Sequence, residues 1–184
     1  MSPAGRDTAY IGLGGNQGDS VACLRSAVRA LAALPGTRLC ACSSLYRTAP
    51  VGTVAQADFV NAVCALSTGL DPRALLEHLL RIEAGHGRVR GAVPGGPRTL
   101  DLDLLLYGHL SRRFPGLELP HPRLHQRAFV LQPLAELAPE LEIPGRGRVR
   151  ELLDHCRGQR VQRMRARLEA ADPVGHLQQA PGQE

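Results

Sequence analysis

Two hydrophobic periods divide the first part of the chain into a strand and a helix. Residues 9–15, AYIGLGG, alternate and end in glycines, which predicts a strand followed by a turn. Asp19 can cap the helix that follows, because an aspartate side chain accepts hydrogen bonds from the free N–H groups of a first helical turn. Apolar residues then recur every three or four positions, at Val21, Leu24, Val28, Leu31 and Leu34.

Three more strands and a second helix follow. Alternation predicts one strand over residues 37–48 and another over 59–66, with a loop between them. Asp71 and Pro72 mark a helix start, since proline loses no hydrogen bond at the first helical position. A glycine-rich loop, residues 87–99, precedes a last strand over 101–107. The buried stripe of the second helix is expected to consist of Leu75, Leu76, Leu79 and Ile82.

The order of these elements predicts the fold class. Strand, helix, strand, strand, helix, strand is the split β-α-β pattern, so we expect an α+β protein: a ferredoxin-like α/β sandwich with a mostly antiparallel sheet. Extra C-terminal helices are expected over residues 130–139 and near 149–156. We expect one domain over 9–164. A flexible N-terminus, residues 1–8, would precede it, and a polar, disordered C-terminal tail, residues 165–184, would follow it.

Composition and charge narrow the possible partners. The chain has 184 residues, of which 43% are apolar, and it has neither an apolar run of membrane-span length nor a signal peptide. We therefore expect a cytoplasmic protein with no membrane partner. The net charge is +5 and all 22 cations are arginine, which reflects a coding bias more readily than a functional choice. The five cysteines lie within apolar patterns and are expected to be buried, without disulfides or zinc.

The strand over residues 101–107, DLDLLLY, carries two aspartates among apolar residues. Side chains alternate across a strand, so Asp101 and Asp103 should share one face with Leu105 and Tyr107. The opposite face should consist of Leu102, Leu104 and Leu106.

Two carboxylates on one face repel each other unless a cation lies between them. Mg²⁺ takes one or two carboxylates together with substrate phosphates, and the nearby Arg88, Arg90 and Arg98 could hold the remaining phosphate oxygens. The alternative is an edge strand whose carboxylates pair with these arginines at the surface.

Six segments of the sequence, in family order over most of residues 9–156, carry a resemblance to a known family. They are YIGLGGNQGD (10–19), SSLYRTAPVG (43–52), DFVNAV (58–63), RIEAGHGRVR (81–90), GPRTLDLDLLLYG (96–108) and LPHPRLHQRAFVLQPLAELAP (119–139). The chain resembles the 6-hydroxymethyl-7,8-dihydropterin pyrophosphokinase family of folate biosynthesis. The resemblance implies transfer of pyrophosphate from ATP to the pterin hydroxymethyl group, leaving AMP and using two Mg²⁺ ions. It also implies small-molecule substrates, and we expect a monomer.

The resemblance also assigns roles position by position. Asp101 and Asp103 would hold the metal ions, while Arg88 and Arg98 would bind the phosphates. The positions implied for ATP are Glu83, Arg90, His121 and Arg127. The positions implied for the pterin are Thr48, Val51, Phe59, Asn61 and Phe129, with the two phenylalanines sandwiching the ring and the asparagine reading its hydrogen-bonding edge. Asn16, at the first turn, is a weaker candidate.

Simpler interpretations stand beside these roles. Most strand phenylalanines pack in a core, and a histidine between two prolines, such as His121, can be a plain turn residue. We expect His125 to be a turn residue. However, Phe59 and Asn61 lie two apart on a strand and so share a face, and a buried amide needs partners.

The sequence departs from the family pattern at three places. The catalytic loop, GAVPGG, has Pro94 and Gly95 where the family carries an arginine and a tryptophan, and Gly15 stands where the family has a serine. After Met164 there is no family counterpart. The arginines at positions 157, 160, 163, 165 and 167 are expected on a solvated helix face, with an acidic partner as the alternative.

The sequence therefore leaves three possible functions. The first is an active pyrophosphokinase. The second is a family member with weak or altered activity, which binds nucleotide or pterin or uses another alcohol, because the loop lacks the arginine and tryptophan. The third is an arginine-rich nucleic-acid-binding module, which the scarcity of aromatic residues, 3% of the chain, argues against.

Overall fold

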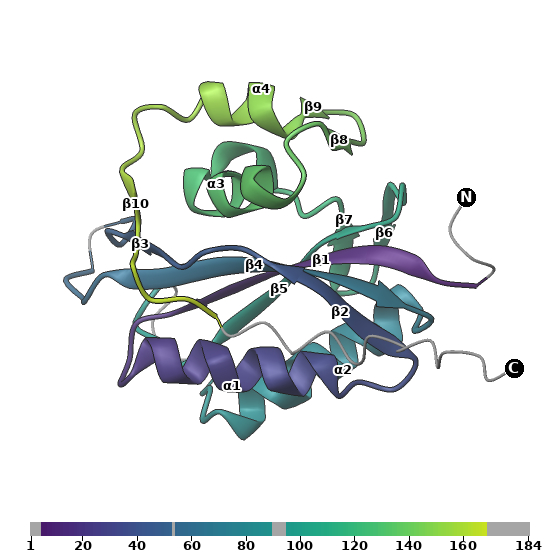
Figure 1. Cartoon of the computed structure of the whole chain (residues 1–184), viewed down its shortest axis with the longest axis horizontal. Helices are drawn as coiled ribbons and strands as arrows, with labels where there is room; N and C mark the ends of the chain where they lie inside the picture. Colours follow the sequence, from purple (N-terminus) through teal and green to yellow (C-terminus); the bar gives the residue numbers. More distant parts are fainter. Residues whose placement is uncertain (1–4, 53, 90–94, 169–184) are drawn as a thin grey trace, which may run out of the picture.

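An antiparallel sheet lies between two layers of helices in the computed structural model, which describes residues 5–52, 54–89 and 95–168 (Figure 1). The described strands of this sheet are β1 (Asp7–Gly15), β2 (Thr37–Cys42), β3 (Tyr46–Thr48), β4 (Phe59–Thr68), β5 (Asp101–Tyr107) and β10 (Val161–Arg163). They follow the order β10-β3-β4-β1-β5, and β2 also pairs with β4. Every pairing is antiparallel. The protein is therefore a mixed α/β protein with an antiparallel sheet.

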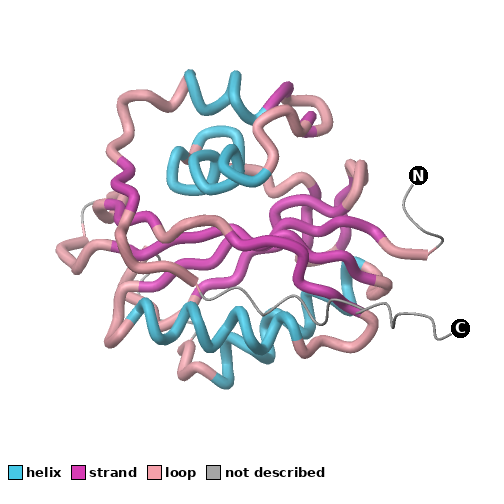
Figure 2. The backbone as a smooth tube through the Cα atoms, viewed as in Figure 1, coloured by secondary structure: helices cyan, strands magenta, loops and turns pink. Residues whose placement is uncertain are grey.

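The helices divide between the two faces of the sheet. One face is covered by α1 (Ser20–Ala32) and α2 (Pro72–Gly85), and the other by α3 (Ala128–Leu137), while α4 (Val149–Asp154) packs on the side of α3 away from the sheet (Figure 1). Short elements complete the described chain (Figure 2): the 3-10 turn η1 (Leu124–Gln126), the hairpin β6 (Arg112–Phe114) with β7 (Leu117–Leu119), and the pair β8 (Glu142–Ile143) with β9 (Gly147–Arg148). Within the described ranges, no helix combines the length and the apolar character needed to cross a membrane.

Both predicted helix starts are confirmed. The carboxylate of Asp19 accepts a hydrogen bond from the N–H of Ala22 at 3.0 Å, and that of Asp71 accepts two, from Arg73 and Ala74, also at 3.0 Å. These bonds satisfy N–H groups that have no partner inside the helix. The predicted apolar stripes then face the sheet, and their most deeply buried residues are Leu24, Val28, Leu31, Leu75 and Leu79.

The strand predicted over residues 37–48 is two strands, so that prediction was wrong in its middle. β2 and β3 both pair with β4, but the chain leaves the ladder between them. At Ser43 the side-chain oxygen replaces a backbone acceptor, because it accepts the N–H of Val63 at 2.9 Å. At Ser44 the backbone N–H donates to the carboxylate of Glu136 on α3, at 3.0 Å. The backbone N–H of Ser43 still donates to the carbonyl oxygen of Val63 at 2.9 Å, but the other two bonds involve side chains, so the regular ladder ends here although the sequence alternates.

The side chains of β5 alternate between the two faces of the sheet as predicted only as far as Leu105. Asp101, Asp103 and Leu105 share the α3 side, but Leu106 also packs on that side while Tyr107 packs with the α1–α2 core. The cause is a bulge, since the register between β1 and β5 shifts at Tyr10 and leaves an extra residue on β5. The Tyr107 hydroxyl donates to the carbonyl oxygen of Leu70 at 2.6 Å.

The prediction that the cysteines are buried was wrong for Cys40, and a second register shift explains why. Cys40 is exposed, because the pairing of β2 with β4 shifts between Leu39 and Ala41 and places this residue in the bulge. Cys42 and Cys64 are opposite each other across the two strands, with their sulfur atoms 2.9 Å apart, and both are free thiols.

The end of the described chain contradicts the expected solvated helix face. Residues 161–163 form strand β10, which pairs with β3. The chain then passes from the α3 side of the sheet to the α1 side (Figure 1), where the Arg25 guanidinium donates to the carbonyl oxygen of Arg167 at 2.9 and 3.1 Å. Leu168, only 8% exposed, joins the core. Strand β1 thus begins at Asp7, and the described chain remains part of the core as far as Leu168. Residues 1–4 and 169–184 lie outside the described residues.

Candidate active site

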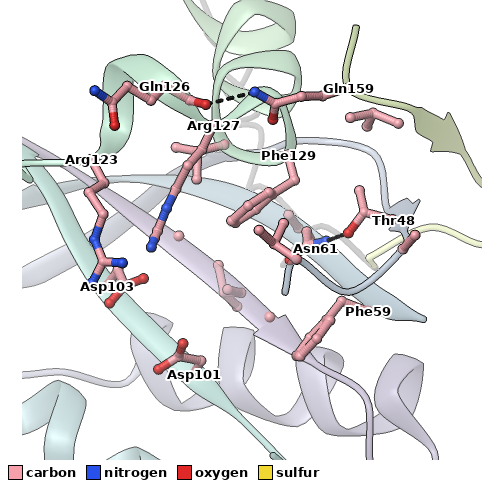
Figure 3. A pocket seen from close by; sticks show the side chains of 18 of the residues that line it. Thr48, Phe59, Asn61, Asp101, Asp103, Arg123, Gln126, Arg127, Phe129 and Gln159 are labelled. Carbon is pink, nitrogen blue, oxygen red and sulfur yellow. Dashed lines mark hydrogen bonds between the residues drawn. The ribbon is translucent and has the colours of Figure 1, made fainter. Parts of the chain in front are cut away.

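A cavity of about 670 Å³ opens between the sheet and α3 (Figure 3). Its floor is β1, where Gly12 and Gly14 carry no side chain that could fill the space. A Cβ atom on Gly14 would lie 3.0 Å from the side-chain oxygen of Asn61, closer than such contacts normally come. The glycines of the first strand therefore keep the cavity open toward Asn61.

The cavity brings together nine side chains that the sequence analysis selected. They come from segments far apart along the chain: strand β3 and the loop after it, strands β4 and β5, the loop before β5, and the start of α3 with the residue before it. They are Thr48, Val51, Phe59, Asn61, Arg98, Asp101, Asp103, Arg127 and Phe129. Val51 lines the cavity while 80% exposed, and Thr48 and Asn61 are buried. Their assigned roles stay predictions.

Two arginines hold Asp101. The Nη1 atom of Arg88 lies 2.9 Å from Oδ1 of Asp101, and Nε of Arg98 lies 3.3 Å from Oδ2. Arg88 also donates to the carbonyl oxygen of Leu100 at 2.9 Å, which fixes its guanidinium beside β5. The alternative of an edge strand with carboxylate–arginine pairing thus describes Asp101, because β5 is the last strand of the sheet, although Asp101 also lines the cavity.

Asp103 has a different environment from Asp101. Burial and the negative charge of Asp101 raise the pKa of Asp103 to about 6, while the positive charges of Arg127 and Arg98 act in the opposite direction. Figure 3 shows the guanidinium groups of Arg123 and Arg127 reaching toward this carboxylate from the α3 side. The site thus holds two neighbouring carboxylates, of which Asp103 has the raised pKa, surrounded by arginines. Within the described ranges, no group of three or more His, Cys, Asp or Glu side chains is arranged to hold a metal ion.

The opposite end of the cavity is lined by two aromatic rings and a side-chain amide. The amide of Asn61 donates to the hydroxyl of Thr48 at 2.8 Å, and the rings of Phe59 and Phe129 lie on either side of this pair (Figure 3). An arginine faces each ring: the guanidinium carbon of Arg98 lies 5.0 Å from the centre of Phe59, and that of Arg127 lies 5.4 Å from the centre of Phe129. This end can hold a flat, polar-edged ring next to positive charge.

Three of the predicted nucleotide and phosphate residues do not line this cavity. Arg88 lies behind Asp101, as described above. Glu83, on α2, is 1% exposed and accepts the N–H of Leu102 at 2.8 Å, which places it beneath β5. His121 lines a smaller cavity of about 250 Å³, next to Pro120 and Pro122. Arg90 lies outside the described residues.

His121 is held in a neutral form. Its ring Nδ1 accepts the backbone N–H of Arg123 at 3.2 Å, and its own backbone N–H donates to the carbonyl oxygen of Leu105 at 2.9 Å. Burial, together with the positive charges of Arg127 and Arg123, lowers the pKa of His121 to about 4. This histidine can therefore accept or donate hydrogen bonds near neutral pH without adding charge.

Sequence reasoning missed several residues of the cavity wall. Arg123 and Gln126 precede α3, and no periodic pattern marks them. Three more come from the C-terminal segment: Gln159, Arg160 and Val161. That segment was expected to be a solvated helix, and its lack of strict alternation hid the strand that brings it to the cavity.

Asn16, the weaker candidate, joins three loops at one end of the cavity. Its amide nitrogen donates to the side chain of Gln56 at 3.0 Å and to the carbonyl oxygen of Ala57 at 2.9 Å, while its oxygen accepts the N–H of Arg98 at 2.9 Å. Gln56 in turn donates to the carbonyl oxygen of Gly95 at 2.8 Å. Asn16 thus positions Arg98 and ties it to the loop before β4.

The glycine at position 15 has a steric explanation. A Cβ atom there would overlap the carbonyl oxygen of Thr99. The loop before β5 therefore comes closer to β1 than a side chain at this position would allow. The backbone N–H groups of Asn16 and Gln17 both donate to the carbonyl oxygen of Arg98, at 2.9 and 3.2 Å.

Comparison with known proteins gives one consistent family. The model of the 7,8-dihydro-6-hydroxymethylpterin-pyrophosphokinase family matches residues 10–139. A 2-amino-4-hydroxy-6-hydroxymethyldihydropteridine pyrophosphokinase from Pseudomonas aeruginosa is 44% identical over 155 residues, which cover 84% of this chain and 95% of that protein. One of the same name from Methylorubrum extorquens is 50% identical over 145 residues, covering 79% of this chain and 90% of that protein.

Solved structures agree on the fold. The wild-type HPPK-DHPS chain of Plasmodium falciparum matches with a TM-score of 0.63 at 15% sequence identity, covering 82% of this chain. This chain spans 41% of the length of that solved chain, and the likeness concerns the fold alone. With a matching family model and relatives of similar length, the chain belongs to the 7,8-dihydro-6-hydroxymethylpterin-pyrophosphokinase family.

Proposed function

We propose that this protein transfers pyrophosphate from ATP to the hydroxymethyl group of 6-hydroxymethyl-7,8-dihydropterin, giving AMP and the pterin diphosphate for folate biosynthesis. The observation that carries the proposal is the composition of one cavity, which has paired carboxylates and arginines at one end and two phenylalanines around an asparagine at the other. A triphosphate matches the charged end and a pterin the aromatic end. Membership of the family supports the same assignment.

Asp101 and Asp103 fit a site for Mg²⁺. Carboxylate oxygens are the hard ligands that this ion prefers, and the pKa of Asp103 is raised by burial and by the charge of Asp101, both of which a bound cation would offset. We propose that these two residues hold two ions together with the phosphates of ATP. Bound Mg²⁺ would neutralise the triphosphate and the carboxylates and would lower the pKa of the attacking hydroxyl.

The arginines of the cavity bind the phosphate chain. Arg98 lies between Asp101 and the ring of Phe59, so its guanidinium reaches both the charged and the aromatic end. Arg98 holds the phosphates undergoing transfer, and Arg127 takes part in binding ATP from the α3 side. Arg88, which does not line the cavity, is assigned to the same phosphates by the family resemblance and contacts Asp101. A planar guanidinium can form two parallel hydrogen bonds with a phosphate, which fixes its orientation as well as its charge.

The remaining ATP residues act from the margins of the cavity. Glu83 supports β5 from beneath, through the N–H of Leu102. His121, neutral and next to Arg123, offers a hydrogen-bonding ring to the nucleotide. Arg90 is part of the same proposal from the family resemblance.

The aromatic end positions the pterin. Phe59 and Phe129 take the two faces of the ring, and Asn61, oriented by its bond to Thr48, reads the hydrogen-bonding edge. Val51 belongs to the loop that borders the ring. With both substrates held this way, the reaction depends on alignment and on charge neutralisation by the arginines, as in other phosphoryl transfers.

The proposal also covers the fold type, the oligomeric state, the location and the partners of the protein. A ferredoxin-like sandwich is supported by the two central strands β4 and β1, flanked by β3 and β5, with α1 and α2 on one face. We propose a single domain that acts as a monomer in the cytoplasm, on small-molecule substrates and without a nucleic-acid partner. The alternative of weak or altered activity rests on the loop without tryptophan, and high similarity to named pyrophosphokinases does not favour it.

The test is product formation by the purified full chain. With ATP, Mg²⁺ and 6-hydroxymethyl-7,8-dihydropterin, AMP and the pterin diphosphate should appear together in a one-to-one ratio. A pterin without the hydroxyl group is the control and should yield no AMP. If folded protein yields neither product, or yields AMP with the control pterin, the proposed transfer is wrong.

A further inference from the structure

Glu136 lies at the centre of a polar cluster outside the cavity. Its carboxylate accepts the N–H of Ser44 at 3.0 Å, the hydroxyl of Ser44 at 2.9 Å and the hydroxyl of Tyr46 at 2.7 Å. Arg163 on β10 completes the cluster: its Nη2 atom lies 3.5 Å from the Glu136 carboxylate, and its Nε donates to the Ser44 hydroxyl at 2.9 Å. Three segments of the chain, residues 44–46, α3 and β10, therefore meet at one carboxylate.

The cluster is built to hold a charged carboxylate. Burial acts to raise the pKa of Glu136, but the hydrogen bonds from Tyr46 and Ser44 and the charge of Arg163 outweigh it and lower the pKa below its ordinary value. The same contact, together with burial, raises the pKa of Tyr46 to about 12, so its hydroxyl stays a donor. Hydrogen bonds to a charged acceptor are stronger than those between neutral groups.

This carboxylate connects the two walls of the aromatic end of the cavity. Glu136 lies seven residues after Phe129 on α3, which places both side chains on the same face of the helix about 10 Å apart along its axis. Tyr46 lies two residues before Thr48 on β3, so these two side chains also share a face. Thr48 then accepts the amide of Asn61. The wall carrying Phe129 and the wall carrying Thr48 and Asn61 thus meet at Glu136.

The C-terminal segment holds the other end of α3. The side chain of Gln159 accepts the N–H of Ala128, the first residue of α3, at 3.0 Å and donates to the carbonyl oxygen of Gln126 at 2.8 Å (Figure 3). Arg127, which precedes the helix, makes no side-chain capping bond. Residues 159–163 therefore fix α3 at its start through Gln159 and near its end through Arg163.

We propose that Glu136 is a positioning residue for the acceptor: it sets the spacing between α3 and β3, and with it the width of the slot between Phe129 and Phe59. This inference rests on the proposed function, because it assigns the slot to the pterin. Glu136 touches no substrate. Its effect is carried by helix α3, which presents Phe129 and is held by the Ser44–Tyr46–Arg163 contacts.

Replacing Glu136 by alanine should therefore weaken the pterin site selectively. We expect the dissociation constant of 6-hydroxymethyl-7,8-dihydropterin to rise about tenfold, because the variant loses a charged acceptor shared by several donors. Affinity for a non-hydrolysable ATP analogue with Mg²⁺ should change less than about twofold. Glu136→Gln, which keeps one accepting oxygen, should restore part of the loss, and Tyr46→Phe should show a smaller loss of the same kind.

Pterin fluorescence measures this directly, because the chain contains no tryptophan whose emission would interfere. The titration uses the full chain with the ATP analogue and Mg²⁺ present. Glu140→Ala is the matched control: this carboxylate follows α3 but pairs with Arg150 at 2.6 Å, away from the cavity. It should bind the pterin like the unchanged protein.

The outcomes separate this inference from the proposed function. If the unchanged protein binds no pterin, the proposed function fails and this inference fails with it. If the unchanged protein binds the pterin and Glu136→Ala and Tyr46→Phe bind it equally well, only the positioning role is wrong. If Glu136→Ala loses affinity for both substrates to the same extent, its role is general stability, which also contradicts the proposal.

Discussion

Asp103 is flanked on β5 by two leucines that pack against the helices, while its own side chain faces Asp101, Arg98 and Arg127 in the cavity. The surrounding structure disfavours its charge, as the raised pKa records. A residue whose charge lowers the stability of the fold is best explained by a role in binding or catalysis, because ionisable groups with shifted pKa values are concentrated at functional sites.

Replacing Asp103 by asparagine should separate stability from activity. The neutral amide removes the repulsion with Asp101, so thermal unfolding in the presence of a chelator should occur at an equal or higher temperature than in the unchanged protein. Turnover should fall about 10³-fold, because several kcal/mol of charge stabilisation in the transition state would be lost. Calorimetry and the AMP assay measure the two effects on the same preparation. Near-normal turnover would contradict the metal-binding role.

At the residue scale, the sequence predicted those site residues whose placement follows from their near neighbours in the chain. Phe59 and Asn61 were paired by strand alternation, and the two aspartates by the same rule. Arg123 and Gln56 were missed because their roles depend on where distant segments meet, and nothing in their neighbourhood shows this. The Asn16 contacts with Gln56 and Ala57 span 40 and 41 positions of the chain, beyond the reach of any periodic pattern.

At the scale of elements, helices were predicted better than strand boundaries. Asp19 and Asp71 cap their helices through bonds within three residues, so the sequence nearby contains the whole explanation. The break between β2 and β3 depends on Glu136, more than 90 positions away from Ser44 along the chain. The bulges in β2 and β5 likewise arise from pairing with another strand.

The contact between α3 and β3 predicts a pH effect on stability. Because the folded protein lowers the pKa of Glu136, the charged carboxylate stabilises the fold above its ordinary pKa of 4.5, and this stabilisation is lost as the pH falls through the lower folded value. Between about pH 5 and pH 3, the unchanged protein should therefore lose more stability than Glu136→Gln. Of the groups facing Glu136, the Ser44 hydroxyl is not ionisable, and Tyr46, whose pKa is raised to about 12, keeps its proton throughout this range.

Urea unfolding at several pH values measures this difference. The two proteins should converge toward acid and diverge toward neutral pH, with the unchanged protein the more stable one at pH 7. Parallel stability curves over the whole range would show that Glu136 has no special ionisation in the fold.

At the scale of the whole molecule, the order of elements predicted the helix-covered sheet, because short connections leave few ways to arrange them. The C-terminal segment was not predictable in this way. Its strand is three residues long, and it is recognisable only by its pairing with β3. Its continuation supplies Leu168 to the core on the opposite face of the sheet, so one segment connects both layers.

Truncation tests this connection. A chain that ends at residue 158 lacks β10, the Gln159 contacts and Leu168, and it should lose at least about 2 kcal/mol of unfolding free energy, the lower range for deleting a buried leucine side chain. A chain that ends at Leu168 is the control, because it keeps every contact described here. Urea unfolding measures both. Coincident midpoints for the two chains would contradict a structural role for residues 159–168.

The late position of Gln159, Arg160 and Val161 along the chain has a consequence for biosynthesis. A ribosome makes β1, β4, β5 and α3 before these residues, so a growing chain can assemble the carboxylate–arginine end of the cavity before Gln159 holds the start of α3 and before Arg163 joins Glu136 near its end. During translation, the protein would then acquire its nucleotide side before its acceptor side. A message cut short within the codons for residues 159–163 would yield a polypeptide that still captures ATP but has a loosened pterin slot.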